Sequence, residues 1–204
     1  MLADETSCRD EEELAEEYCA IAAQRFVAPS SSQLALSIAQ LAVMMHMPPS
    51  PRSPRQRYRY RSVEEFVLRE GVAFATKAPP RNIAMGQTKR CFANCSKRAL
   101  LSRNYAYCEG IALAEPGFPP MRHAWLLDLT DGLAFDPTWR PSGVAYIGVV
   151  IDKAYLAAVF PTAGCVIDNY RAKWPILAGT VGDTWRHRWL ADQLAVTGVM
   201  PGAT

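Results

Sequence analysis

The 204-residue chain lacks the features that mark several large protein classes. Its longest apolar runs, such as residues 41–45, fall far short of the roughly 18 residues that a transmembrane helix needs. The first residues are acidic and no apolar segment follows them, so we expect no secretory signal and a cytoplasmic protein without membrane contact. In that compartment the six cysteines are expected to be reduced thiols.

The chain as a whole also lacks a large excess of charge of one sign, but two of its segments do not. The formal net charge is +2. Residues 1–26 nevertheless carry a net charge of −6, and residues 51–103 carry +10. Such segregation indicates either two segments that attract each other or a basic face that is kept for a partner.

The spacing of apolar residues divides the chain into helices and strands. Apolar residues three and four positions apart predict helices at 9–27, 33–46, 62–74, 89–102, 153–160 and 183–196. Alternating β-branched and aromatic residues predict strands at 105–113, 123–129, 133–139 and 144–151. Pro29 is expected to break the first helix before a serine caps the second, and Thr88 is expected to cap the fourth. The order favours an α+β fold with a mostly antiparallel sheet.

Four prolines between residues 48 and 54 forbid a helix there and indicate a boundary. We therefore expect a helical N-terminal extension at 1–50, a Pro/Arg-rich linker at 51–61 and the main domain at 62–204. The linker interleaves arginines with tyrosines, a combination that can hold phosphates and stack bases. Because it is short and broken by proline, we favour a solvated linker that docks on the acidic first helix. A nucleic-acid partner stays open but is not favoured.

The stretch 86–95 contains the first residue that points to chemistry. If Thr88 caps the helix, Cys91 lies in the first turn, where the helix dipole favours a thiolate. Lys89 and Arg90 add positive charge beside it, which is the environment that a nucleophilic cysteine needs. The backbone N–H of Cys91 and the side chain of Gln87 are the candidate donors to an oxyanion.

The stretches 121–128 and 133–139 are expected to form a β-hairpin. If the loop is 129–132, His123 and Asp136 share one face of the sheet as diagonal neighbours. A loop differing by one residue would place them on opposite faces. Asp128 is a rival acid, but this register points it to the other face. A histidine beside the cysteine can take the thiol proton, and an acid can fix the orientation of the imidazole.

Three short motifs together resemble the transglutaminase-like branch of the papain-like cysteine hydrolase superfamily. They are Cys91-Phe92-Ala93-Asn94 at a helix start, His123-Ala124-Trp125 opening a strand and Asp136-Pro137-Thr138-Trp139 closing the next. The resemblance covers about residues 62–160. It implies that a helix carrying the nucleophile packs on an antiparallel sheet that carries the histidine and the acid.

The same resemblance implies a thiol hydrolase or acyltransferase with the triad Cys91, His123 and Asp136. Such an enzyme acts on an amide or peptide-like carbonyl of a peptide, a protein or a small amide, through an acyl-enzyme. It requires no metal and no organic cofactor. Phe92, Trp125 and Trp139 are the candidate residues of the substrate cleft. The natural substrate does not carry over from the resemblance.

Other interpretations of these residues stay open. Cys91 could be a small buried hydrophobe, as free cysteines usually are. Cys91, Cys95, Cys108 and His123 could instead bind zinc, although their spacing is not usual for a zinc site. The chain could also be an inactive binding module on the same fold, whose basic Arg/Tyr linker contacts nucleic acid or a protein partner.

Overall fold

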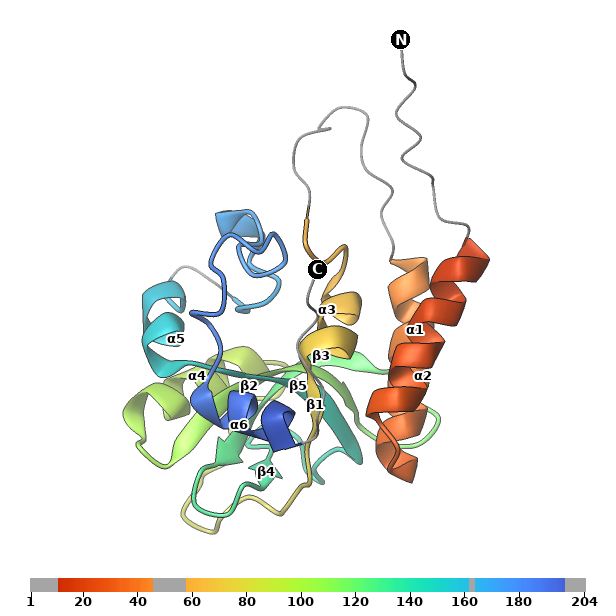
Figure 1. Cartoon of the computed structure of the whole chain (residues 1–204). Coiled ribbons are helices and arrows are strands. Elements are labelled where there is room, and N and C mark those ends of the chain that lie inside the picture. The colour runs from red at the N-terminus through yellow and green to blue at the C-terminus, as the bar shows by residue number, and fades with distance from the viewer. Residues whose placement is uncertain (1–10, 46–57, 162–163, 197–204) are drawn as a thin grey trace.

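The computed structural model describes residues 11–45, 58–161 and 164–196, which form an α+β fold (Figure 1). The helices in these ranges are α1 (Glu11–Arg25), α2 (Pro29–Met44), α3 (Val63–Glu70), α4 (Cys91–Leu101), α5 (Lys153–Val159) and α6 (Arg188–Val196). The strands are β1 (Val72–Ala73), β2 (Tyr105–Leu113), β3 (Met121–Asp128), β4 (Ala134–Phe135) and β5 (Ala145–Ile151). The expected α+β class is therefore confirmed. None of the described helices is both long and apolar enough to cross a bilayer.

The five strands form one sheet in the order β1-β5-β2-β3-β4, and all neighbouring strands are antiparallel. Gly110 and Gly148 face each other between the central strands β2 and β5. A Cβ atom on Gly148 would lie 2.7 Å from the ring of Trp125, which is too close for an ordinary contact. Gly148 therefore makes room for this large, fully buried side chain on the sheet, while Gly110 allows the close approach of the β5 backbone.

Helices α1 and α2 lie side by side at one side of the sheet, and α5 lies at the opposite side (Figure 1). Helix α2 packs against α3 and β5, and buried α1 residues such as Tyr18 belong to the same core as the sheet. Arg25 donates a hydrogen bond to the carbonyl of Gly71 at 2.9 Å. The N-terminal helices are thus joined to the main core by direct packing. Residues 46–57, which include most of the expected linker, lie outside the described residues, so the division into domains stays a prediction.

Several helix ends differ from the sequence-based prediction for local reasons. Helix α1 ends at Arg25, before Pro29 as expected, and Pro29 begins α2, because its fixed φ and missing N–H suit the first turn of a helix. The predicted serine cap of α2 is wrong, since Ala28 occupies that position without a side-chain cap. The prediction that Thr88 caps α4 is wrong, since Arg90 occupies that position without a side-chain cap. Ser62 does cap α3, accepting a hydrogen bond from the Glu65 N–H at 3.0 Å.

The strand predictions were accurate where the pairing is long and inaccurate at the sheet edges. Strand β2 has the predicted bounds. The predicted strand at 133–139 shrinks to the two residues of β4, because the chain turns at Asp136 and Pro137. The helix predicted at 62–74 ends at Glu70, and the short edge strand β1 follows it. The helix predicted from residue 183 begins only at Arg188.

Candidate active site

Cys91 is the first residue of α4, and only 8% of its surface is exposed. The turn before it is fastened by Asn94, whose side-chain amide donates to the carbonyl of Gln87 at 2.8 Å and to the Thr138 hydroxyl at 3.1 Å. The Gly86 N–H donates to the carbonyl of Pro137 at 2.7 Å. These bonds hold the start of α4 against the turn that follows Asp136.

His123 and Asp136 form a buried pair, with 2.7 Å between His123 Nε2 and Asp136 Oδ2. The ladder between β3 and β4 has the predicted register, since Leu126 pairs with Phe135 and Leu127 with Ala134. The two side chains are 2% and 0% exposed. The hairpin therefore brings together the histidine and the acid that the sequence placed on one face.

The carboxylate of Asp136 is held by three further donors. Its Oδ1 accepts hydrogen bonds from the backbone N–H of Thr138 at 2.7 Å and of Trp139 at 3.2 Å. Its Oδ2 accepts the Tyr146 hydroxyl at 3.1 Å, and that hydroxyl in turn accepts the N–H of Gly143 at 2.7 Å. The carboxylate is thus fixed by its own turn and by strand β5.

The thiol of Cys91 acts on the His123 imidazole through a hydrogen bond and through its charge. Because Nε2 is bound to Asp136, Nδ1 is the ring nitrogen left for the thiol. Burial alone would lower the pKa of His123. The hydrogen bonds and negative charges of Asp136 and Cys91 outweigh that effect and raise the pKa to about 9. The ring is therefore placed to hold a proton between the carboxylate and the sulfur.

The aromatic residues predicted for the cleft occupy different positions. The Trp139 ring stacks on His123 with 3.8 Å between ring centroids, and it lines an open pocket. Trp125 is fully buried against Phe74 and Tyr146, so it supports the site from within the core and does not line a cleft. Phe92 is partly buried against the core, next to the cysteine.

Gln87, the predicted oxyanion donor, lies exposed in the turn before α4. Its side-chain oxygen accepts a hydrogen bond from Arg90 at 3.0 Å. The backbone N–H groups of Cys91 and Phe92 are in the first turn of the helix, where N–H groups have no acceptor within the helix. The geometry therefore favours the backbone donors, and the role of Gln87 stays a prediction.

The other buried cysteines of the described residues, Cys95 and Cys108, form hydrogen bonds with the backbone. Cys95 donates its thiol to the carbonyl of Ala124 at 3.3 Å, and Cys108 is fully buried. Burial raises the pKa of both thiols, which makes them poor nucleophiles. In the described part of the chain no group of three or more His, Cys, Asp or Glu side chains is placed to hold a metal ion. The zinc alternative therefore has no site there.

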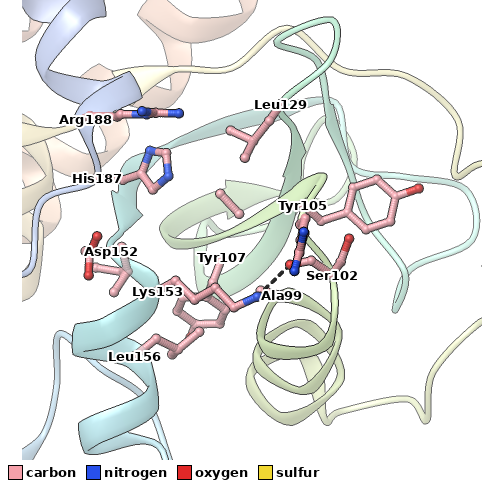
Figure 2. Close-up of a pocket in the computed structure, with 13 residues that line it drawn as sticks. Ala99, Ser102, Tyr105, Tyr107, Leu129, Asp152, Lys153, Leu156, His187 and Arg188 are labelled. Atoms are coloured by element: carbon pink, nitrogen blue, oxygen red, sulfur yellow. Dashed lines mark hydrogen bonds between the residues drawn. The ribbon is translucent and has the colours of Figure 1, made fainter.

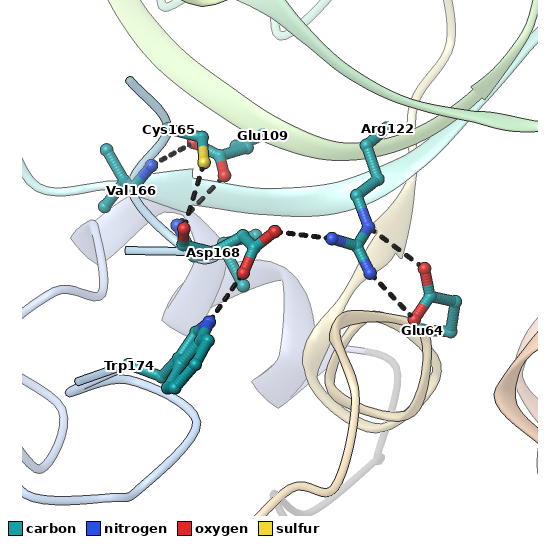
Figure 3. A network of polar contacts seen from close by, with 8 residues as sticks. Glu64, Glu109, Arg122, Cys165, Val166, Asp168 and Trp174 are labelled. Atoms are coloured by element: carbon teal, nitrogen blue, oxygen red, sulfur yellow. Dashed lines mark hydrogen bonds and ion pairs between the residues drawn. The ribbon is translucent and has the colours of Figure 1, made fainter. Parts of the chain in front are cut away.

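The opposite face of β3 carries a separate polar network (Figure 3). Arg122 donates to Asp168 at 2.6 Å and to Glu64 at 3.1 Å. Nearby on β2, buried Glu109 accepts three hydrogen bonds within 2.9 Å, from the Tyr107 hydroxyl and the N–H groups of Val166 and Ile167. This network attaches the segment around residues 165–168 to the sheet.

Two pockets lie near opposite ends of α4. The pocket beside Trp139 has a volume of about 720 Å³. The other has about 440 Å³ and is lined by Ala99, Tyr107, Leu156 and His187, among others (Figure 2). None of the three residues Cys91, His123 and Asp136 lines either pocket. The first pocket is linked to the candidate site through Trp139, whose ring lines it and stacks on His123.

Two residues of the site had no role in the sequence-based prediction. Tyr146 comes from β5, far along the chain, and no local pattern connects it to Asp136. Asn94 stands in the motif around Cys91, and a polar residue one turn after the cysteine was its only sign.

No protein-family model, curated protein or solved structure matches the chain.

Proposed function

We propose that the protein is a thiol-dependent hydrolase or acyltransferase that acts on an amide or peptide-like carbonyl. The observation that carries the proposal is the His123 imidazole, bound to Asp136 at 2.7 Å, while the Cys91 thiol also raises its pKa. A cysteine, a histidine and an acid in contact, with the cysteine at a helix start, are the parts of a thiol acyl-transfer site. The order and spacing of the motifs support placement in the transglutaminase-like branch of papain-like enzymes.

The chemistry follows from the positions of these groups. The Cys91 sulfur attacks the carbonyl carbon, and its proton passes to His123 Nδ1. The N–H groups of the first turn of α4 stabilise the negative oxygen of the tetrahedral intermediate. The C–N bond then breaks, and the departing amine takes the proton from His123. Water or a second amine attacks the resulting thioester, releases the acyl group and restores the thiol.

The environment of Asp136 suits an orienting role. Its carboxylate is bound by two backbone N–H groups and by Tyr146, so it cannot rotate away from the imidazole without losing these bonds. The stacked Trp139 ring restricts the imidazole from another side. The histidine is therefore held in one orientation, with one nitrogen on the acid and the other toward the sulfur.

The rate of iodoacetamide labelling at each cysteine, measured by mass spectrometry across pH, tests the proposal. Cys91 is expected to react fastest and to keep reacting well below pH 8, and His123→Ala should abolish that advantage. Cys19 is the matched control, because it is exposed but stands on α1 away from the triad. Slow labelling of Cys91 with the pH profile of Cys19 would refute a nucleophilic role and leave the inactive binding module as the better explanation.

A further inference from the structure

The pocket beside Trp139 neighbours the proposed thiol site through one shared side chain, while Cys91, His123 and Asp136 themselves lie outside its lining. Trp139 lines the pocket and also stacks on His123, so one side chain joins the pocket to the proposed reacting groups. A volume of about 720 Å³ is large enough for several amino-acid side chains. Whatever charge the pocket carries will therefore act on the groups flanking the reacting amide.

The rim of this pocket is positively charged. Arg81 and Arg140 both line it, both are exposed, and neither has an ion-pair partner among the described residues. Lys77 also lines the pocket, but it lies 2.7 Å from Asp128 and 2.6 Å from Asp131, which compensate its charge. The two arginines thus leave an uncompensated positive charge beside the site.

The turn before the nucleophile extends the same charge. Lys89 and Arg90 precede Cys91 and are exposed, and the start of α4 adds the positive end of a helix dipole. Asp136, the carboxylate of the site, is fully buried and bound to His123, so it does not offset this charge at the surface. Negative groups of a substrate therefore meet positive charge from the pocket rim and from the turn before α4.

The wall of the pocket is apolar between the charged side chains. It includes the proline pair Pro79-Pro80, Ile83 and Met85 beside Trp139. Such a surface suits an extended peptide, whose backbone and aliphatic side-chain parts lie on the prolines and the tryptophan while acidic ends reach the arginines. Nucleic acid would need exposed aromatic platforms for several bases, and the pocket offers one partly buried ring.

We propose that the pocket beside Trp139 binds acidic peptide segments and makes the thiol site selective for amides flanked by Asp or Glu. This selectivity rests on the proposed function, because it assigns the substrate class of the same site. Guanidinium groups bind carboxylates through paired hydrogen bonds, so Arg81 and Arg140 would each hold one acidic side chain.

A pair of reagents for Cys91 separates the selectivity from the reactivity. Iodoacetate and iodoacetamide alkylate the same sulfur, but only iodoacetate is negatively charged. The rate of labelling by iodoacetate divided by the rate by iodoacetamide at Cys91 therefore reports the local charge. The double variant Arg81→Glu/Arg140→Glu is expected to lower this ratio by about tenfold at low salt. The double variant Arg103→Glu/Arg188→Glu makes the same change of charge in the pocket of Figure 2 and should leave the ratio unchanged.

Protection of Cys91 by peptides tests the class of ligand. A Glu-rich hexapeptide is expected to slow iodoacetamide labelling of Cys91, whereas a Lys-rich hexapeptide of equal length does not. The protection should disappear in the double variant and weaken at high salt. An oligonucleotide of equal charge that protects more strongly than the Glu-rich peptide would overturn the assignment to acidic peptides.

The outcomes distinguish the two proposals. If Cys91 is no more reactive than Cys19, the proposed function fails and the selectivity fails with it. If Cys91 is reactive but the double variant keeps the reagent ratio and the Glu-rich peptide gives no protection, the acidic selectivity alone is refuted. A lower ratio together with protection by the Glu-rich peptide supports both.

Discussion

Two consecutive residues of β3 show how differently the two faces of the sheet are used. His123 points to one face, where it meets Asp136 and the thiol of Cys91. Arg122 points to the other, where it binds Glu64 and Asp168 (Figure 3). Both faces bury carboxylates beside basic groups. Only on the first face does the histidine interact with a cysteine, the proposed nucleophile Cys91.

The difference lies in what the buried acids bind. Glu109, on the face of Arg122, is surrounded by backbone N–H groups and a tyrosine, so its hydrogen bonds hold parts of the chain together. Asp136 also binds backbone N–H groups, but one of its oxygens faces a titratable ring. A buried carboxylate alone therefore does not mark an active site. The feature that sets Asp136 apart is its bond to a histidine on which the Cys91 thiol also acts, and our proposal rests on that feature.

The largest expected effect is on the face of His123. Asp136→Asn keeps the shape of the side chain but removes the charge that orients and stabilises the protonated imidazole, so turnover of an amide should fall by about 10³- to 10⁴-fold. Asp128→Asn is the matched control on the same hairpin, because Asp128 binds Lys77 and Thr130. An equal loss in both variants would show that the hairpin fold and not the acid is responsible.

The next effect is on the opposite face and concerns stability. Glu109→Ala leaves two buried N–H groups and a buried hydroxyl without their acceptor, so the free energy of unfolding should fall by about 3–5 kcal/mol. Urea unfolding measures the loss. In the protein that remains folded, the iodoacetamide reactivity of Cys91 should be retained. A variant of full stability with an unreactive Cys91 would contradict the separation of the two faces.

The pKa values of the two described histidines, His123 and His187, should be shifted in opposite directions. Asp136 and Cys91 raise the pKa of His123 to about 9, whereas burial lowers the pKa of His187 below its ordinary value. Ring-proton NMR should find midpoints on either side of 6.5, and Asp136→Asn should bring the His123 midpoint down. Because the folded pKa of His123 is raised, its contribution to stability is complete below about pH 6.5 and is lost as pH rises through about 9. A His123 midpoint below that of His187 would refute the buried ion pair.

The smallest expected effect comes from the support behind Asp136. Tyr146→Phe removes one hydrogen bond to the carboxylate, which corresponds to about 1.4 kcal/mol and a tenfold loss of turnover. It should also lower the pH midpoint of His123, a change that loss of packing alone would not produce. Tyr105→Phe, at a ring that packs on Phe135, is the control and should change neither. If both variants behave alike, Tyr146 acts through packing only.

The sequence predicted the parts of the site that depend on local pattern. The hairpin register followed from the alternation around His123 and Asp136, and the observed ladder has that register. The helix at Cys91 followed from apolar spacing, although its start was misplaced because Thr88 resembles a cap. At that end no side chain caps the helix, and the Asn94 amide fixes the turn by donating to Gln87 and Thr138.

The contributions of distant segments could not be predicted. Trp125 was expected in the cleft because it follows His123, but its side chain fills the space above Gly148, a glycine on another strand. Tyr146 was assigned no role, since its bond to Asp136 exists only after β5 and the turn at 136–139 are placed together. Arg81 and Arg140 are separated by nearly 60 residues and share a rim only in the folded chain.

The sequence by itself determined the α+β order of elements, the face shared by His123 and Asp136, and the excess of basic residues around Cys91. These properties depend on residue periodicity and composition, which act over a few positions of the chain. Tertiary structure decided the contact between Cys91 and His123, the support of Asp136 and the charge of the pocket. Those depend on burial and on bonds between distant segments, which come into being only when the sheet brings the segments together.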